Sequence, residues 1–86
     1  MNVLIPTQLQ SYTGGQSRVL ASGRTLSEVL DCLEEDYPGI RFRMIDEQDR
    51  IREHIRIFIA GENASDVHCV VGENDEVQIV GALSGG

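Results

Sequence analysis

The residues with the most distinctive potential chemistry are the last three, Ser84, Gly85 and Gly86. Glycine has no side chain, so two glycines in a row form a strip of bare backbone that can enter a narrow channel. They directly follow an apolar, strand-like run over residues 77–83. We therefore expect a strand to hold the base of a free tail, and the terminal carboxylate of Gly86 to be the reactive group.

A carboxylate reacts with nucleophiles only after one of its oxygens has become part of a good leaving group. The sequence contains neither G-x-x-x-x-G-K-[ST] nor G-x-G-x-x-G, the glycine motifs that bind nucleotide phosphates. The pair Gly14-Gly15 is better explained as a hairpin turn. The chain is therefore expected not to be an enzyme, and a partner enzyme must activate Gly86.

Two histidines and two cysteines are the other candidates for chemistry. His54 and His68 could ligate a metal with Cys69, but the three lack a recognised ligand spacing. A Cys–His nucleophilic pair is also conceivable, yet nothing in the sequence indicates an oxyanion site beside it. Structural or surface roles are the simpler interpretation, with Cys32 as a small core residue.

The charge balance limits the kind of partner. Fourteen acidic residues face seven basic ones, which gives a formal net charge of −7 over 86 residues. Nucleic acid and anionic membranes attract clustered positive charge, so neither is expected as a partner. The acidic clusters at 34–36 and 73–76 are interpreted as solvated faces, with docking on a basic groove of another protein as the alternative.

All seven basic residues are arginines, so the chain has no lysine side chain through which copies could be joined. It shows no signal-peptide pattern and no apolar run of about 18 residues. Two distant cysteines without C-x-x-C spacing indicate reduced thiols. A cytoplasmic protein is expected.

Hydrophobic alternation predicts strands at residues 2–5, 17–21, 55–60 and 76–83, with a short extended piece at 67–71. The first two should form a hairpin across a polar turn region at 7–16. Residues 61–63 are expected to form a turn, as are residues 72–75. The stretch 40–53 is interpreted as an irregular crossing with one helical turn.

One helix is predicted between the hairpin and the third strand. Thr25 and Glu28 match the capping box, in which the two residues satisfy free amide donors reciprocally. Pro38 and Gly39 end the helix. The apolar positions follow helical spacing and form one buried stripe: Leu26, Val29, Leu30, Leu33 and Tyr37.

Several short strands and one amphipathic helix predict an α+β fold, the ubiquitin-like β-grasp, in which a mixed sheet of four to five strands packs on one helix. The domain covers residues 1–83, and residues 84–86 form a flexible tail. Alternation directs one set of side chains toward the helix: Val3, Ile5, Ile55, Ile57, Ile59, Val77 and Ile79. The opposite face should carry an apolar patch that binds a partner, consisting of Leu4, Pro6, Phe58 and Val80.

Segments in a fixed order along nearly the whole chain resemble the MoaD/ThiS family of ubiquitin-like sulfur carriers. They are V-L-I-P at 3–6, T-G-G at 13–15, T-L-S-E-V-L at 25–30, Y-P-G-I-R at 37–41, F-I-A-G-E at 58–62, D-E-V at 75–77 and the final G-G. The length of the region 37–56 is more similar to the carriers of cysteine biosynthesis than to the small subunits of molybdopterin synthase. Two positions depart from the family pattern: Asn74, where a left-handed Gly is common, and Gly81, near which Pro is common.

The resemblance implies a mechanism. An adenylating enzyme similar to ubiquitin-activating enzymes, using ATP and magnesium, would adenylate Gly86, and sulfur transfer would convert it to a thiocarboxylate. A sulfur-accepting synthase would then receive the sulfur for cysteine, molybdopterin, thiamine or a related product. The chain itself would bind no cofactor. The alternative is a ubiquitin-like modifier that becomes attached through Gly86 to lysines of target proteins.

Overall fold

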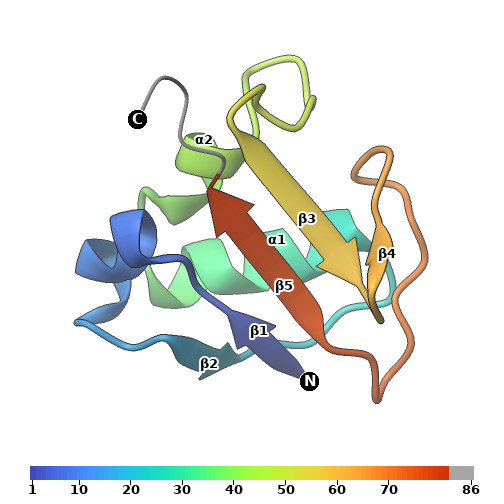
Figure 1. The fold of residues 1–86 in the computed structure, drawn as a ribbon, viewed down its shortest axis with the longest axis horizontal. Coiled ribbons are helices and arrows are strands. Elements are labelled where there is room, and N and C mark those ends of the chain that lie inside the picture. The colour runs from blue at the N-terminus through green and yellow to red at the C-terminus, as the bar shows by residue number, and fades with distance from the viewer. Residues whose placement is uncertain (82–86) are drawn as a thin grey trace.

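Five strands form one mixed sheet in the order β2-β1-β5-β3-β4, and a helix crosses one of its faces (Figure 1). The computed structural model describes residues 1–81. The strands are β1 (Asn2–Leu4), β2 (Arg18–Leu20), β3 (Ile55–Ile59), β4 (Glu62–Asn63) and β5 (Val77–Gly81), and the helix is α1 (Leu26–Asp36). The predicted β-grasp fold is confirmed.

The strand pairing places β5 at the centre of the sheet. It runs parallel to β1, with Val3 beside Val77, and antiparallel to β3, with Ile57 beside Ile79. The first hairpin pairs β1 with β2 antiparallel, as predicted. Because β1 and β5 lie side by side although far apart in sequence, the two ends of the described chain are joined into one sheet.

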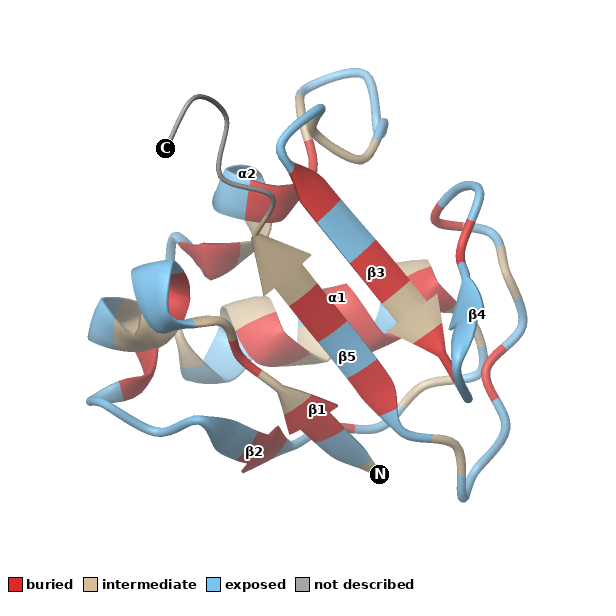
Figure 2. Cartoon of the chain, viewed as in Figure 1, coloured by how far each residue is buried: buried red, intermediate tan, exposed pale blue. Residues whose placement is uncertain are grey.

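Alternation along the strands determines which side chains reach α1. Figure 2 shows this period of two on β3, where buried residues alternate with more exposed ones. Four apolar residues of α1 are buried against the sheet, with no exposed surface: Leu26, Val29, Leu30 and Leu33. All seven side chains predicted to face the helix are buried, at most 8% exposed: Val3, Ile5, Ile55, Ile57, Ile59, Val77 and Ile79.

The predicted cap of α1 is present in a modified form. The hydroxyl oxygen of Thr25 accepts a hydrogen bond from the backbone N–H of Glu28 at 3.3 Å. The Glu28 carboxylate accepts from the backbone N–H of Arg24, one residue before the expected donor, at 3.0 Å. Both contacts hold the entry to the helix, as a capping box does.

The stretch 67–71 was expected to be extended and instead forms a loop that completes this cap. The N–H groups of Leu26 and Ser27 donate to the carbonyls of Cys69 and Val67, at 2.9 and 2.8 Å. Only Val70 makes a bridge to the backbone of Thr25. The first backbone N–H groups of a helix have no acceptor within the helix. The carbonyls of residues 67–71 accept from these groups, so this stretch caps α1 instead of pairing as a strand.

The polar region 7–16 contains a helical segment that the sequence analysis missed. Residues Thr7–Thr13 form a 3-10 helix, η1, which Gly14 ends in the left-handed conformation at φ 64°. Leu9 of this helix is buried in the core, and the Thr13 hydroxyl donates to the carbonyl of Gln16 at 2.8 Å. The predicted glycine turn is present, but it follows this helix.

The predicted helical turn within 40–53 is confirmed as α2 (Ile40–Met44). Ile40 and Met44 have no exposed surface, so this short helix contributes to the core. Gly39 precedes it at φ 96°, a left-handed conformation that allows the sharp reversal after α1.

One turn prediction was wrong in its bounds, whereas the turn predicted at 72–75 is confirmed by a hydrogen bond from the backbone N–H of Asp75 to the carbonyl of Gly72, at 3.0 Å. The turn between β3 and β4 consists of Ala60 and Gly61, at φ 51° and 86°, and not of residues 61–63. Both central residues of this two-residue hairpin turn are left-handed, which matches the twist of the strands and imposes some strain on Ala60. Asn74 is not in the left-handed region, where the only non-glycine residues among 1–81 are Asp49 and Ala60.

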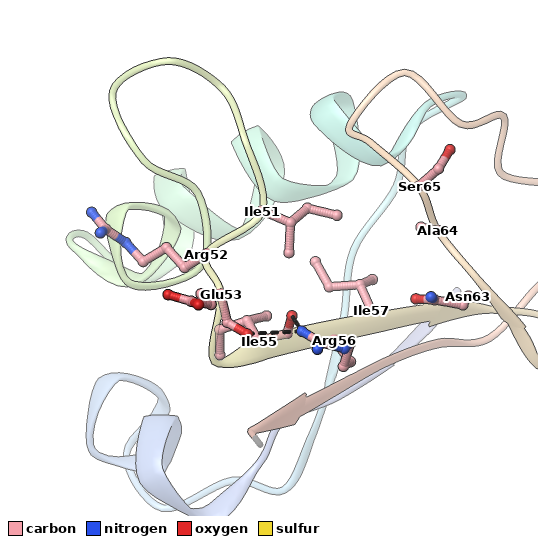
Figure 3. A pocket seen from close by; sticks show the side chains of 9 residues that line it. All are labelled: Ile51, Arg52, Glu53, Ile55, Arg56, Ile57, Asn63, Ala64 and Ser65. Carbon is pink, nitrogen blue, oxygen red and sulfur yellow. Dashed lines mark hydrogen bonds between the residues drawn. The ribbon is translucent and has the colours of Figure 1, made fainter. Parts of the chain in front are cut away.

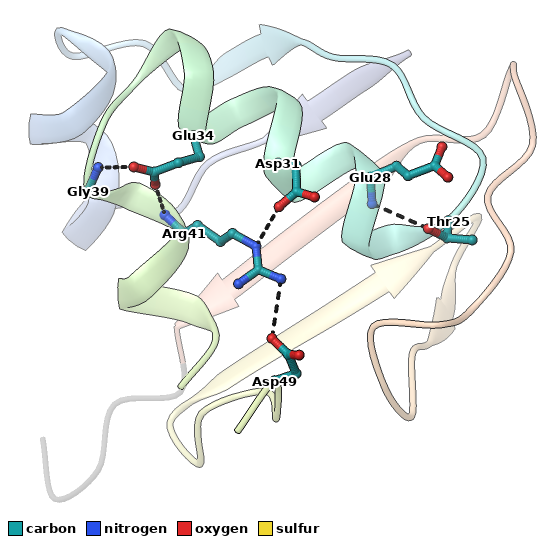
Figure 4. A network of polar contacts seen from close by, with 7 residues as sticks. All are labelled: Thr25, Glu28, Asp31, Glu34, Gly39, Arg41 and Asp49. Atoms are coloured by element: carbon teal, nitrogen blue, oxygen red, sulfur yellow. Dashed lines mark hydrogen bonds and ion pairs between the residues drawn. The ribbon is translucent and has the colours of Figure 1, made fainter. Parts of the chain in front are cut away.

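The acidic end of α1 is used to start α2 (Figure 4). The two carboxylate oxygens of Glu34 accept from the backbone N–H groups of Gly39 and Arg41, at 2.8 and 3.0 Å. These bonds lower the pKa of Glu34, the one from Gly39 most. The guanidinium of Arg41 pairs with Asp31 at 2.9 Å and with Asp49 at 3.6 Å.

We expect Glu34→Ala to destabilise the fold by about 1–2 kcal/mol, because two backbone donors lose a charged acceptor. A lowered folded-state pKa means that the stabilisation is complete above the unfolded pKa of Glu34 and is lost as the pH falls through the folded value. Urea denaturation at pH 7 and at pH 3 measures this. The neighbouring Glu35→Ala, on an exposed side chain, is the control; an equal loss in both variants would contradict the assignment.

Candidate functional site

The last described residue, Gly81, is the root of the predicted tail. It pairs with Ile55 in the antiparallel ladder between β5 and β3. The carboxamide of Gln8, from η1, lies so close that a Cβ on Gly81 would be 1.8 Å from Gln8 Nε2. Any larger residue at 81 would therefore displace Gln8. The predicted tail residues Ser84, Gly85 and Gly86 lie outside the described residues.

Three of the four predicted patch residues lie on the sheet face opposite α1. Leu4 and Phe58 both have Gln78 as their cross-strand neighbour, from β1 and β3 respectively. Val80, two residues further along β5, points to the same face by alternation. All three are half-buried and lie outside the core cluster. The structure thus brings them together on three adjacent strands.

Pro6, the fourth predicted patch residue, is half-buried and follows β1 directly before η1. The binding role of these four residues remains a prediction.

Three further residues of this face were not assigned to the predicted patch. Leu20 on β2 is 71% exposed and opposite Asn2, and Arg18 on the same strand is opposite Leu4. Arg56 on β3 is opposite Val80. Alternation within 17–21 and 55–60 was the signal that could have found them. We call the seven residues Leu4, Pro6, Arg18, Leu20, Arg56, Phe58 and Val80 the docking face.

The other candidate residues do not assemble into a catalytic site within residues 1–81. His54 and His68 are exposed, and no group of three potential metal ligands lies together in this part of the chain. Cys32 is half-buried against the core, as predicted. Cys69 is half-buried on the loop that caps α1, where a hydrogen bond from the backbone of Asp66 is the main cause that lowers the pKa of its thiol.

A surface hollow of about 270 Å³ lies beside the start of β3 (Figure 3). Its polar lining includes Arg52, Glu53, Arg56 and Asn63. Arg56 Nη1 donates to the carbonyls of Glu53 and Ile55, at 2.8 and 3.1 Å, so the guanidinium is held by the backbone. The lining also contains the hydroxyl of Ser65, whose hydrogen-bond contact is with Cys69 Sγ at 3.8 Å and not with the Glu53 carboxylate.

Membrane crossing is not indicated by the helices of residues 1–81, because each is too short and too polar to span a bilayer.

The sheet, its crossing helix and the open apolar face define a ubiquitin-like β-grasp protein. Within that class, the chain belongs to the ThiS family, which it matches over residues 3–86. It is 34% identical to the sulfur carrier protein CysO of Mycobacterium tuberculosis H37Rv, over all of this chain and 98% of the relative.

Solved structures of similar proteins have the same fold. The M. tuberculosis CysO structure has a TM-score of 0.90 at 33% identity and covers 95% of this chain and 98% of its own. CysO in the Amycolatopsis orientalis BexX/CysO complex has a TM-score of 0.91 at 31% identity, covering 99% of this chain and 98% of its own. The small archaeal modifier protein SAMP1 of Haloferax volcanii has a TM-score of 0.77 at 25% identity and covers 100% and 98%.

Proposed function

We propose that this chain is a sulfur carrier protein of cysteine biosynthesis that acts in the cytoplasm as a co-substrate and not as a catalyst. The observation that carries this proposal is its end-to-end similarity to CysO, a sulfur carrier protein, at 34% identity over the whole chain. The match to the ThiS family also extends to residue 86, which includes the glycine pair. The group that carries the sulfur is the Gly86 carboxylate.

The chemistry requires two steps in a partner. A carboxylate oxygen of Gly86 attacks the α-phosphorus of ATP, with magnesium on the phosphates, and pyrophosphate leaves. A sulfur nucleophile then attacks the acyl adenylate, and AMP leaves with the carboxylate oxygen that attacked. After release from the sulfur donor, the net change is one oxygen replaced by one sulfur. A sulfur-accepting synthase then receives that sulfur from the thiocarboxylate.

The described fold holds the root of the tail at a defined position for this reaction. Gly81 lies at the end of the central strand β5, paired with Ile55 of β3. Five further residues, fully extended, span at most about 18 Å. The active site of the activating enzyme must therefore lie within about that distance of the sheet end when the docking face is bound.

The second candidate is a protein modifier. The similarity to SAMP1, a small archaeal modifier protein, over 100% of this chain favours it. In a modifier the activated carboxyl of Gly86 would form an amide with a lysine of another protein. Because this chain has no lysine, copies could not form side-chain-linked chains with one another.

One experiment separates the two candidates. We expect the epitope-tagged protein, expressed in its native cell, to migrate as a single species on a denaturing gel. Its intact mass should include a form heavier by about 16 Da, the difference between sulfur and oxygen. A ladder of larger species that survives boiling and reductant, and that disappears when Gly86 is deleted, would establish the modifier instead.

A further inference from the structure

The charges of this acidic chain are separated across the thickness of the fold. The helix α1 carries five acidic residues and no basic one: Glu28, Asp31, Glu34, Glu35 and Asp36. On the opposite side of the sheet, the strand positions that point away from α1 carry two charges, and both are positive: Arg18 and Arg56. The net charge of −7 therefore does not describe the docking face.

The two arginines keep their charge available to a partner. Neither makes an ion pair with a carboxylate of residues 1–81, whereas Arg41 on the other side pairs with Asp31. Arg56 donates only to backbone carbonyls, which orient the guanidinium without neutralising it. Both residues are exposed.

Two apolar residues, Leu4 on β1 and Val80 on β5, lie on the strands between these two charges. Arg18 on β2 is beside Leu4, and Arg56 on β3 is beside Val80. The strands β1 and β5 separate β2 from β3, so the arginines are three strand spacings apart, about 14 Å across the sheet. An apolar centre with a positive charge at each side is thus built into the strand register.

Resting on the proposed function, we propose that the docking face binds a surface of the activating enzyme that is apolar at its centre and carries carboxylates opposite Arg18 and Arg56. A basic groove, the alternative considered for the acidic clusters at 34–36 and 73–76, does not suit this face, because it would meet two uncompensated arginines. Complementary charge accelerates association and suppresses wrong orientations.

Glu76 is the one acidic residue that alternation along β5 directs to this face, and it lies at the end of the face away from Gly81. Glu76 directly precedes β5 and is exposed, whereas Arg56 lies at the end where β5 reaches Gly81. The charge of this face is therefore positive near Gly81, the root of the tail, and negative at the opposite end of β5. The partner carboxylate opposite Arg56 is therefore expected on the side where Gly86 enters the active site, whereas Arg18 lies level with Gln78, midway along β5.

The test uses the full chain and the adenylating enzyme encoded in the same genome, with ATP, magnesium and a sulfide source. Conversion is followed by the intact mass as a function of carrier concentration and salt. We expect Arg56→Glu and Arg18→Glu each to raise KM about tenfold or more while kcat changes less than about twofold, with the effect shrinking at high salt. Arg56→Lys should retain most of the affinity.

Arg24→Glu is the matched control, because it makes the same change on an exposed arginine outside the docking face. An equal rise in KM for Arg24→Glu, or a lower KM for Arg56→Glu, would overturn the inference and leave the carrier function intact. A wild-type chain that gains no sulfur would instead overturn the proposed function. Circular dichroism of each variant shows whether the fold is retained.

Discussion

Deletion of Gly86 should abolish the gain of about 16 Da when the chain is incubated with its activating enzyme, ATP and a sulfur donor. The effect is expected to be complete, because the proposal assigns the reacting carboxylate to this residue and a chain ending at Gly85 has its carboxylate one residue, about 3.5 Å, short. Intact-mass spectrometry measures the shift.

Two controls make the Gly86 result specific. The deletion should not change the thermal unfolding midpoint, since the buried residues identified here lie within residues 3–79 and a terminal residue contributes little to stability. Ser84→Ala should still gain the mass. A 16 Da shift that persists without Gly86 would contradict the assignment, and a gain of about 32 Da would indicate a cysteine persulfide instead.

Two neighbouring residues of β5 should respond in opposite ways to the same substitution. Ile79 is 2% exposed and pairs with Ile57, so Ile79→Asp buries a carboxylate without a partner. A loss of several kcal/mol is expected, and a domain of this size has little more than that to lose, so most of the protein should be unfolded.

Val80→Asp, by contrast, adds a charge to the docking face. We expect its free energy of unfolding to fall by no more than about 1 kcal/mol, while binding to the activating enzyme weakens at least tenfold. Urea denaturation and binding titrations measure the pair. If Val80→Asp unfolds the protein and Ile79→Asp does not, the two faces of β5 have been exchanged, as a shift of one residue would produce.

Periodicity predicted four of the five strands, α1 and both faces of those strands, because burial on one side leaves a strong signal in β-branched residues such as Ile55 and Ile57. It missed β4, whose two residues were predicted to belong to a turn. It did not predict η1, where Leu9 is the one fully apolar buried residue and Tyr12 packs against the core only in part. It also missed the role of Glu34, since the donors of Gly39 and Arg41 reach that carboxylate only after the chain reverses.

The candidate site was predicted in part for a similar reason. Alternation identified Leu4, Phe58 and Val80, but the charge of their surroundings depends on which strands are neighbours. Net charge sums over both faces of the sheet and so concealed the positive charge that Arg18 and Arg56 give to this one. The tail residues were identified by composition and family resemblance, and their assignment is tested by the Gly86 deletion.

The position of β5 between β1 and β3 also has a mechanical consequence. An enzyme that draws the chain end into its active site exerts tension on Gly81 along the axis of a strand that is hydrogen-bonded on both sides. Such a load shears two ladders together, whereas a load on an edge strand such as β2 would peel one ladder bond by bond. The sheet therefore resists unfolding when a partner enzyme repeatedly pulls on the chain end and releases it.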